Sequence, residues 1–577
     1  MDDFDVVVVG SGFGGSVTAY RLAAAGRTVC LLERGQAHPP GNFARRPREM
    51  RGNFWDPSKG RYGLFDLWSF GHIDAAVSAG LGGGSLIYAN VLLRKDEKWF
   101  VHDGARGDAY ENCPITRRDL EPHYNNVERV LTPTIYPYDT ITSKTQGMRA
   151  AARLLRIEET TYDRVDPAKP QFFLPPLAIT FAAPGEAPKP GVPLPGAPHD
   201  AKRETCRLCG ECDIGCNFGA KNTLDLTYLR KASALGADIR TLCEVKSFDP
   251  GPSGRGFTIH YLAHDKERTS RRAAPSQHKT VRARVLILAA GTLGTTFLML
   301  ANSARLSRTS RPLGSRFSGN GDLLTVAFNT HEMKPDSRKS KPRLIDPTHG
   351  PVITSAFRFP DSLDCGVGAE RGFYLQDAGY PELVDWLLQE ADVRGNARRL
   401  LRFARIAMVR LLTGRGRADV SRTVAALFGS GRLSYSTLTL LGMGRDVPSG
   451  RLGVRGRHHP QLTLAWNRRG SRAYFDRAIE QAERISVALD GEFVQNPMMH
   501  YLNHLITAHP VGGCPMGRNE KDAVVDSYGA VFGYDGLYIA DGSIMPSAVG
   551  ANPSFTIAAM ADRIAESIIA RFPAGAA

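Results

Sequence analysis

The chain begins with a short apolar run that is followed by a glycine-rich turn. Residues 5–9 read DVVVV, a β-branched run typical of a buried parallel strand, and the sequence GSGFGG follows at residues 10–15. A helical pattern then runs from about Gly14 to Ala25, and residues 28–32 predict a second strand that ends at Glu33. This order predicts a βαβ unit of the Rossmann type.

The spacing of the glycines predicts a dinucleotide site at this turn. Gly10 permits the tight turn, Gly12 lets the backbone approach a pyrophosphate, and Gly15 lets the helix pack closely on the strand. The helix that begins near Gly14 would turn its N-terminus to the phosphates. Glu33 can accept hydrogen bonds from an adenosine ribose. The motif alone leaves FAD and NAD as alternatives.

Later patterns extend this sheet and predict a second one. Residues 115–131 have helical spacing with a candidate cap at Thr116, and residues 238–245 and 281–289 predict strands, the second of which leads into another glycine turn and a helix. From about residue 320 to 500, alternating runs such as Leu323–Phe328 predict an antiparallel sheet. We therefore expect an α/β fold, α+β overall, with a Rossmann-like domain and a second, antiparallel-sheet domain.

Composition narrows the class of protein. With 577 residues, 42% hydrophobic and 23% charged, the chain is an ordinary globular protein of two or three domains. We attribute the net charge of +15 to an arginine-rich source organism and expect no nucleic-acid partner. No secretory signal precedes the first strand, and no apolar run is long enough to span a membrane, so we expect a cytoplasmic protein.

One basic segment could contact a membrane. Residues 398–412 contain five arginines, at positions 398, 399, 402, 405 and 410, which share one arc of a helical wheel. Such a helix could lie on an anionic membrane as a peripheral contact and help to extract a lipid substrate. The alternative is a helix that packs on its own domain and keeps a solvated basic face.

Four of the nine cysteines fall in one short run after a proline-rich loop. Cys206, Cys209, Cys212 and Cys216 have the spacing C-x2-C-x2-C-x3-C of bacterial ferredoxins, but Asn217 stands where those proteins have proline. Three interpretations stay open: an iron–sulfur cluster that relays electrons, a structural zinc site, or unligated or disulfide-paired cysteines that pack a local knot.

The most specific sequences lie near the carboxyl end. They read AHPVGGCPMG at residues 508–517, LYIADGS at 537–543 and GANPSFTI at 550–557. Together with the amino-terminal unit and the triple glycine at 82–84, they closely resemble the glucose–methanol–choline (GMC) oxidoreductase family, in the branch of bacterial cholesterol oxidases with non-covalent FAD. The resemblance covers nearly the whole chain.

The resemblance implies roles for individual residues. His509 would face the flavin and act on the substrate hydroxyl, and Asn552 would hold the alcohol oxygen and the flavin. The resemblance and the amino-terminal motif together assign FAD binding to Gly10, Gly12, Gly14, Gly15, Glu33, Gly83, Gly84, Ser85, Asn90, Val245, Asp541, Gly542, Asn552, Pro553 and Ser554. Residues 1–320, with the proline-rich loop and the cysteines at 165–220, and 501–577 would form the FAD-binding domain, and residues 321–500 the substrate-binding domain.

The chemistry favours His509 as the base. An alcohol gives up a hydride only when its hydroxyl proton leaves or is strongly polarised, and an imidazole has an unperturbed pKa of roughly 6.5. We prefer His509 to His500 and His504 because the glycines that follow it would allow close approach to a planar ring. Cholesterol oxidases also place a glutamate over the substrate, and here residues 376–382, which include Gln376, Asp377 and Glu382, lie in the plausible region.

The sequence therefore predicts an FAD-dependent enzyme that oxidises the CH–OH group of a bulky hydrophobic alcohol, such as a 3β-hydroxysteroid, by hydride transfer to flavin N5. Oxygen or a redox partner would accept the electrons. One alternative is a sugar or long-chain alcohol dehydrogenase that passes electrons through a cysteine-ligated iron–sulfur cluster to a quinone or cytochrome. Another is a basic, flavin-bearing binding protein without alcohol turnover.

Overall fold

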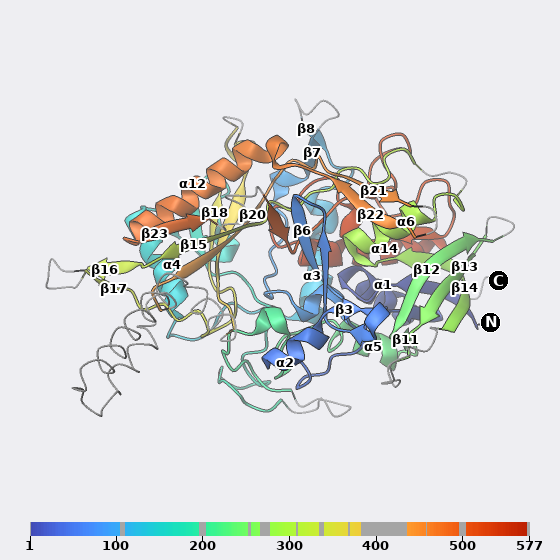
Figure 1. The fold of residues 1–577 in the computed structure, drawn as a ribbon, viewed down its shortest axis with the longest axis horizontal. Helices are drawn as coiled ribbons and strands as arrows, with labels where there is room; N and C mark the ends of the chain where they lie inside the picture. Colours follow the sequence, from blue (N-terminus) through green and yellow to red (C-terminus); the bar gives the residue numbers. More distant parts are fainter. Residues whose placement is uncertain are drawn as a thin grey trace, which may run out of the picture.

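Two large β-sheets with helices packed against them make up most of the fold (Figure 1). The computed structural model describes residues 2–103, 110–194, 203–251, 255–265, 277–306, 310–333, 340–366, 370–381, 435–456, 459–495 and 504–573. In Figure 1 the sheet that contains β12, β13 and β14 lies on the right, and the sheet that contains β15, β18 and β20 lies on the left.

The first sheet contains the predicted βαβ unit. Its order is β11 (Asp238–Arg240), β2 (Val29–Leu32), β1 (Asp2–Val9), β14 (Gln277–Leu288), β13 (Phe257–Ala263) and β12 (Cys243–Pro250), and β25 (Leu537–Ile539) also pairs with β14. The pairs among β11, β2, β1, β14 and β25 are parallel, whereas β12 and β13 form an antiparallel edge. The Rossmann-like prediction is therefore confirmed.

Helices pack beside this sheet. They are α1 (Phe13–Ala24), α3 (Arg117–Leu131), α5 (Tyr228–Ala234), α6 (Gly291–Ala301) and α14 (Ser554–Arg571). Helix α1 contacts α5 and α14, and α14 contacts α3. Thr116 caps α3 as predicted, since its hydroxyl oxygen accepts a hydrogen bond from the amide of Asp119.

The strand predicted over residues 238–245 is divided in the structure. The chain turns after β11 at Leu242, whose φ is 56°, and its amide donates to the carbonyl of Gly35. Because of this turn, β11 pairs in parallel with β2 whereas β12 pairs with β13 at the opposite edge of the sheet. Residues 238–245 thus contribute strands to both edges of one sheet.

The second sheet is largely antiparallel, as predicted. Its order is β23 (Glu492–Gln495), β15 (Leu323–Phe328), β20 (Leu438–Gly444), β19 (Phe373–Ala378), β18 (Ala356–Phe359), β10 (Gln171–Phe173) and β9 (Glu158–Glu159). Only the short pair of β9 and β10 is parallel among its neighbouring strands. Helices α4 (Ser143–Leu154) and α12 (Arg472–Ala488) pack against it. The sheet thus includes strands that precede residue 320, and the predicted domain limits stay a prediction.

Shorter helices and strands complete the described fold. They are α2 (Pro47–Met50), α7 (Ser362–Cys365), β3 (Trp55–Asp56), β4 (Arg61–Tyr62), β5 (Phe65–Ser69), β6 (Ile73–Ser78), β7 (Val101–Asp103), β8 (Tyr110–Asn112), β16 (His331–Met333), β17 (Ser340–Pro342), β21 (Arg451–Arg455), β22 (Gln461–Ala465) and β24 (Leu505–Thr507). Strand β24 pairs with β6 and leads directly into the His509 segment.

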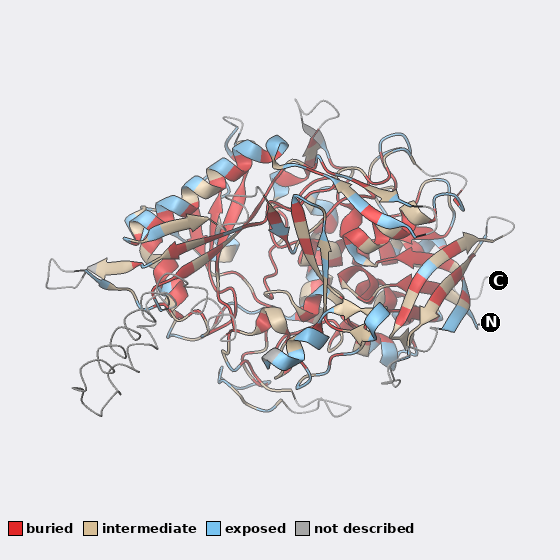
Figure 2. Ribbon diagram, in the orientation of Figure 1, coloured by how far each residue is buried: buried red, intermediate tan, exposed pale blue. Residues whose placement is uncertain are grey.

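The buried residues concentrate in the two sheets and the helices packed on them (Figure 2). One apolar cluster surrounds β1, β2 and β14, and a second surrounds β15, β18, β19 and α12. Within the described ranges, no helix is both long and apolar enough to cross a membrane.

Candidate active site

The His509 loop follows β24 and is held by a carboxylate from the start of the second sheet. Asp322 precedes β15, and its Oδ1 lies 2.8 Å from Nδ1 of His509. Its Oδ2 accepts hydrogen bonds from the amides of Ala508 and His509 at 2.8 and 3.2 Å and from the hydroxyl of Thr507 at 2.8 Å. With Nδ1–H donated to Asp322, the neutral ring keeps the Nε2 lone pair for a substrate.

The surroundings of His509 also set its basicity. Burial lowers the pKa of the imidazole, but the negative charge of Asp322 and its hydrogen bond raise it, and the net pKa lies above the ordinary value. Asp322 therefore favours the imidazolium that would form when the ring takes a proton. The partnership resembles the carboxylate–histidine pair of hydrolytic triads in its logic, since the acid orients the base and stabilises its cation.

The second predicted catalytic residue, Asn552, lies on a segment held by the same short stretch of chain. Asn320 donates from Nδ2 to the carbonyl of Ala551 at 2.9 Å, and its Oδ1 accepts from the amide of Gly550 at 2.9 Å. Asn320 can do this because its backbone is left-handed, with φ of 54°. Residues 320 and 322 thus fix the Asn552 segment and the His509 loop, and bring the two predicted catalytic segments to one place.

The glycines after His509 pack closely against other parts of the protein. A Cβ on Gly512 would lie 2.0 Å from the carbonyl oxygen of Arg316, and one on Gly513 would lie 2.3 Å from Oγ1 of Thr296. Both have positive φ. These glycines therefore let the His509 loop pack closely against Arg316 and Thr296, and their approach to a planar ring stays a prediction.

The dinucleotide turn has the geometry that its glycines require. Gly10 has φ of 96°, and a Cβ on Gly15 would lie 1.9 Å from the carbonyl oxygen of Gly10. A Cβ on Gly12 would meet no atom within 4 Å. The helix thus packs directly on the turn, while open space beside Gly12 leaves room for a phosphate at the start of α1.

Glu33 lies at the end of β2 and is almost fully buried. Its Oε2 accepts hydrogen bonds from the amide and hydroxyl of Ser11 at 2.9 and 2.6 Å, and its Oε1 accepts from the amide of Gly35 at 2.8 Å. An ionised carboxylate has about four acceptor sites, so one stays for a ribose hydroxyl.

The triple-glycine segment lies against the dinucleotide turn. Gly83 and Ser85 belong to a short helical turn, Gly83–Leu86, and a Cβ on Gly83 would lie 2.6 Å from Cα of Gly12. Gly84 faces open space. The Ser85 hydroxyl donates to the carbonyl of Gly82 and accepts from the amide of Leu224, so it is engaged within the protein.

Asn90 provides the clearest sign of a bound group. It is fully buried, its φ is 68°, and neither its amide nitrogen nor its amide oxygen has a hydrogen-bond partner in the protein. Buried polar atoms are nearly always paired, so an unpaired amide beside the predicted flavin segment indicates a ligand. The residues present therefore fit FAD.

The remaining predicted FAD contacts lie at the carboxyl ends of the same sheet or at its edge. Gly14 packs on the backbone that precedes Asp541, because its Cβ would lie 2.2 Å from the carbonyl oxygen of Ala540. The carbonyl of Gly542 accepts from the amide of Gly512, which joins this segment to the His509 loop. Burial raises the pKa of Asp541. Pro553 and Ser554 begin α14, and Val245 is buried in β12.

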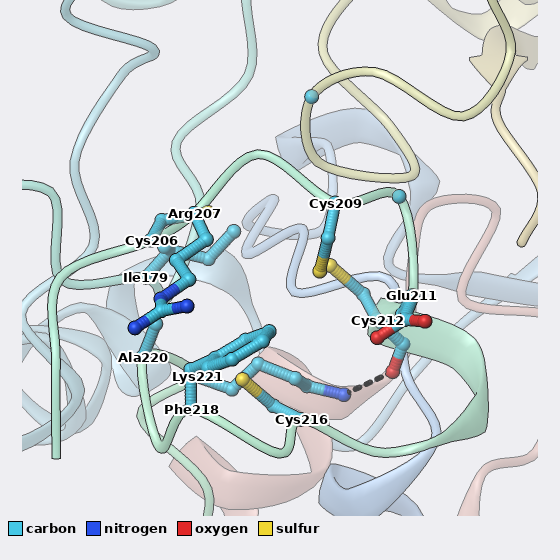
Figure 3. A pocket seen from close by; sticks show the side chains of 12 residues that line it. Ile179, Cys206, Arg207, Cys209, Glu211, Cys212, Cys216, Phe218, Ala220 and Lys221 are labelled. Carbon is cyan, nitrogen blue, oxygen red and sulfur yellow. Dashed lines mark hydrogen bonds between the residues drawn. The ribbon is translucent and has the colours of Figure 1, made fainter. Parts of the chain in front are cut away.

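The four clustered cysteines line one cavity together with Lys221 (Figure 3). Burial raises the thiol pKa of Cys209 to about 12 and raises those of Cys206 and Cys212. All nine cysteines of the chain, Cys216 included, are free, so the disulfide-paired interpretation is wrong. Within the described part of the chain, no three or more histidine, cysteine, aspartate or glutamate side chains are arranged to hold a metal ion.

Other predicted residues have different places. Gln376 pairs with Asn552, whereas Asp377 is buried in an ion pair with Lys144 at 3.1 Å. His504 contacts the carbonyl of Gly71 and the carboxylate of Asp74, away from the His509 loop contacts. Residues 382, 500 and 398–412, which carry the alternative glutamate, the other histidine and the basic helix, lie outside the described residues.

Sequence reasoning missed Asp322, Asn320 and the pairing of Gln376 with Asn552. Asp322 and Asn320 stand in a loop that has no motif, and their partners are more than 180 residues away in the chain. The only local signal was the sequence NGD before a predicted strand, which is typical of turns in general.

Comparison with known proteins agrees with this geometry. Residues 186–318 and 456–561 match the GMC oxidoreductase family, and residues 5–70 match the FAD dependent oxidoreductase family. A cholesterol oxidase of Mycobacterium tuberculosis is 30% identical over 98% of this chain and 90% of its own length. A cholesterol oxidase of Acinetobacter baumannii is 26% identical over 99% and 95%, and a long-chain-alcohol oxidase of Arabidopsis thaliana is 23% identical over 97% and 66%.

The fold and these matches define an FAD-dependent oxidoreductase that acts on alcohols. Its parallel sheet, glycine turn and unpaired Asn90 amide suit the cofactor, and a histidine held by a carboxylate suits the proton chemistry. The chain belongs to the GMC oxidoreductase family.

Proposed function

We propose that this enzyme oxidises the CH–OH group of a bulky hydrophobic alcohol, with a 3β-hydroxysteroid such as cholesterol as the first candidate, and that His509 is the base. The observation that supports this most is the contact between Asp322 Oδ1 and His509 Nδ1, next to the segment that carries Asn552. Two relatives that align over nearly the full chain are named cholesterol oxidases.

The chain's own residues account for the fate of the hydroxyl proton. Nε2 of His509 accepts the proton as the O–H bond breaks, and Asp322 stabilises the resulting imidazolium. The amide of Asn552 orients the alcohol oxygen without changing its own charge. The C–H bond then breaks with its electron pair, and the carbon–oxygen double bond forms.

FAD, when bound, supplies the acceptor for that hydride at flavin N5. Residues at the glycine turn, Gly10–Gly15, would hold its pyrophosphate, and Glu33 its adenosine ribose. Gly83, Gly84 and Asn90 would lie against the isoalloxazine, and Asp541 and Gly542 beside the chain that links it to the phosphates. The protein contributes position and electrostatics, while the redox chemistry belongs to the cofactor.

The test is anaerobic mixing of the purified FAD-bound protein with cholesterol in detergent micelles. We expect the visible flavin band to bleach, and H509Q should keep its FAD but lose most of this rate. Full activity of H509Q would refute His509 as the base. A band that stays unbleached in the wild type, while dithionite still reduces it, would refute the steroid and direct the test to long-chain and sugar alcohols.

A second candidate concerns the path of the electrons. We propose, as the alternative, a sugar or long-chain alcohol dehydrogenase in which the four cysteines would hold an iron–sulfur cluster, and the cluster would supply an electron relay toward a quinone or cytochrome. The backbone N–H of Leu208 donates to Sγ of Cys206 at 3.4 Å, and hydrogen bonds from the backbone of Glu211 and Val352 act to lower the thiol pKa of Cys209 and of Cys212, against the larger effect of burial, which raises both. Such donors stabilise thiolates, which are the ligands of these clusters.

The loop that carries the cysteines is connected to the segment predicted to lie against the flavin. The buried ammonium of Lys221 donates to the carbonyl of Cys212 at 2.6 Å and to those of Leu86 and Tyr88 at 3.1 and 2.9 Å (Figure 3). Lys221 therefore ties the cysteine loop to the segment predicted to lie against the flavin, and its positive charge would offset an anionic cluster.

Iron and acid-labile sulfide should be measured in protein purified without oxygen. Both elements should be present in the wild type and lost in C206S, whereas C365S, which changes an exposed cysteine outside the run, should keep them. Absence of both elements from the wild type would refute the cluster. Rapid return of flavin colour on admitting air would identify oxygen as a competent acceptor.

A further inference from the structure

The side chain of Gln376 reaches from the second sheet to Asn552. Gln376 lies in β19, between β18 and β20, and is fully buried. Its Nε2 donates to Oδ1 of Asn552 at 2.9 Å, and Nδ2 of Asn552 donates to its Oε1 at 3.4 Å. The two amides thus form a reciprocal pair across 176 residues of sequence.

The pair restricts both side chains. Each amide has two N–H donors and two carbonyl lone pairs, and the pair uses one donor and one lone pair on each side. If either amide turned alone, an N–H would face an N–H and a carbonyl would face a carbonyl. Asn552 therefore keeps one N–H and one lone pair, in a fixed direction, for a bound molecule.

We propose that Gln376 is a positioning residue that fixes the amide of Asn552 toward the alcohol, and that this place requires a side chain able both to donate and to accept. The inference rests on the proposed role of Asn552 in holding the alcohol oxygen. A carboxylate at residue 376 can only accept, so it would leave Oδ1 of Asn552 without a donor and facing a negative charge.

The surroundings of residue 376 determine how a carboxyl there would titrate. Its neighbours across the sheet are Ala356 and Leu441, which carry no charge. Asp377 and Lys144 pair on the other face of β19, because successive side chains of a strand alternate.

The apolar cluster that contains Ala356 also holds the thiols of Cys206 and Cys212. Further along the sheet, on the face of Gln376, the described residues include four ionisable groups. They are Arg358, the carboxylates Asp96 and Asp364 that it contacts, and the Tyr374 phenol that donates to Asp96. Lys95 donates to carbonyls of the segment before Asn552. Arg358 is already matched by its two carboxylates, so burial should dominate and raise the pKa of a carboxyl at residue 376 well above its ordinary value.

The test is the pH profile of Q376E compared with that of wild type. The new carboxyl can donate and accept as the amide does while it is protonated, but it can only accept once it is ionised. The rate of flavin reduction by cholesterol in the FAD-bound protein, divided by the wild-type rate at the same pH, should therefore rise about tenfold or more from pH 9 to pH 6. Dividing by the wild-type rate removes the pH dependence that His509 gives to both proteins. A ratio that stays near one at all pH values would overturn the proposal.

A second variant guards against a folding defect in Q376E. Q376M has a similar length but neither donates nor accepts, so it should lose about tenfold in rate, equally at all pH values, while keeping FAD. Wild-type rates in Q376M would also overturn the proposal. Q481E makes the glutamate change at a surface glutamine of α12 and should behave as wild type.

Including H509Q in the same series separates the two proposals. If H509Q is inactive while the Q376E ratio is flat, the base assignment stands and the role of Gln376 is wrong. If H509Q keeps full activity, the proposed function fails first, whatever the ratio shows.

Discussion

Replacing Asp322 by asparagine tests the central contact of the site. Oδ2 of Asp322 accepts three hydrogen bonds, from Thr507, Ala508 and His509, and Oδ1 lies against Nδ1 of His509. In D322N the single carbonyl oxygen should keep the three donors, which turns the new NH2 group to the ring. Nδ1 must then accept, so the proton moves to Nε2.

This exchange removes the lone pair that would take the hydroxyl proton. Loss of general-base catalysis costs about 10²–10⁴ in rate, and the corresponding asparagine change in a serine protease triad, which traps the wrong tautomer, lies at the upper end. We therefore expect flavin reduction in D322N to slow by about 10²–10⁴, or ~3–5 kcal/mol of activation free energy. Binding of FAD should not change, because Asp322 contacts the His509 loop and none of the predicted FAD residues.

The pH dependence of the flavin-reduction rate gives an independent test of the role of Asp322. His509 acts as a base only when neutral, so the wild-type rate should rise with pH through its pKa, which Asp322 holds above the ordinary value. Loss of the negative charge lowers that pKa, so in D322N the remaining rate should rise at a lower pH. Stopped-flow bleaching of the flavin from pH 5 to 9 measures both effects.

A matched control uses an exposed aspartate. D476N removes a carboxylate that contacts Arg472 on the surface of α12, and it should leave the rate and the pH profile unchanged. If D322N keeps the wild-type rate, or loses rate without any shift of the profile, then Asp322 does not set the tautomer and basicity of His509, and the reasoning fails.

Four further substitutions test the fold around the site. G15A should lower the unfolding temperature and the FAD content, because its Cβ would lie 1.9 Å from a backbone oxygen, whereas G12A should fold normally and only bind FAD more weakly. Thermal melts with flavin fluorescence distinguish the two variants, and equal behaviour of both would contradict this reasoning. K144M should lower the free energy of unfolding by about 3–5 kcal/mol, since it leaves the Asp377 carboxylate buried without its cation. Urea denaturation measures this loss, and an unchanged midpoint of the unfolding transition would count against a structural ion pair. D446N removes a carboxyl whose pKa burial raises to about 7. Such a group loses stabilisation as pH rises from about 4 to 7, so D446N should gain up to ~4 kcal/mol relative to wild type over that range, and a constant difference would refute the raised pKa.

Local patterns predicted the parts of the fold whose physics is local. The β-branched run of β1, the glycine spacing before α1 and the cap at Thr116 each depend on neighbours within a few residues, and the structure has all three. The turn at Leu242 and the strand β9, which reads only Glu158–Glu159, have no such signal. A left-handed leucine and a two-residue polar strand exist because of partners elsewhere in the sheet, so periodicity could not reveal them.

The same difference between local and distant contacts applies to the residues of the candidate site. His509 and Asn552 could be found in the sequence because a family resemblance marks both positions. The residues that contact them lie at no fixed distance from them in the sequence. Asp322 and Gln376 contact these segments from the second sheet, and they stand 187 and 176 residues from His509 and Asn552 in the chain. An aspartate before a strand or a glutamine within one is common in any sequence, so only the folded chain identifies these two.

The positions of these partners suggest how the enzyme can vary its substrate without losing its chemistry. Asn320 and Asp322 stand immediately before β15, and Gln376 stands within β19, so the second sheet supplies contacts to both predicted catalytic segments. The predicted FAD segments also make backbone contacts within the first sheet, such as that between Gly14 and Ala540. Changes in loops of the second domain can therefore reshape a pocket while β15 and β19 hold His509 and Asn552 in place, provided that these two strands keep their register.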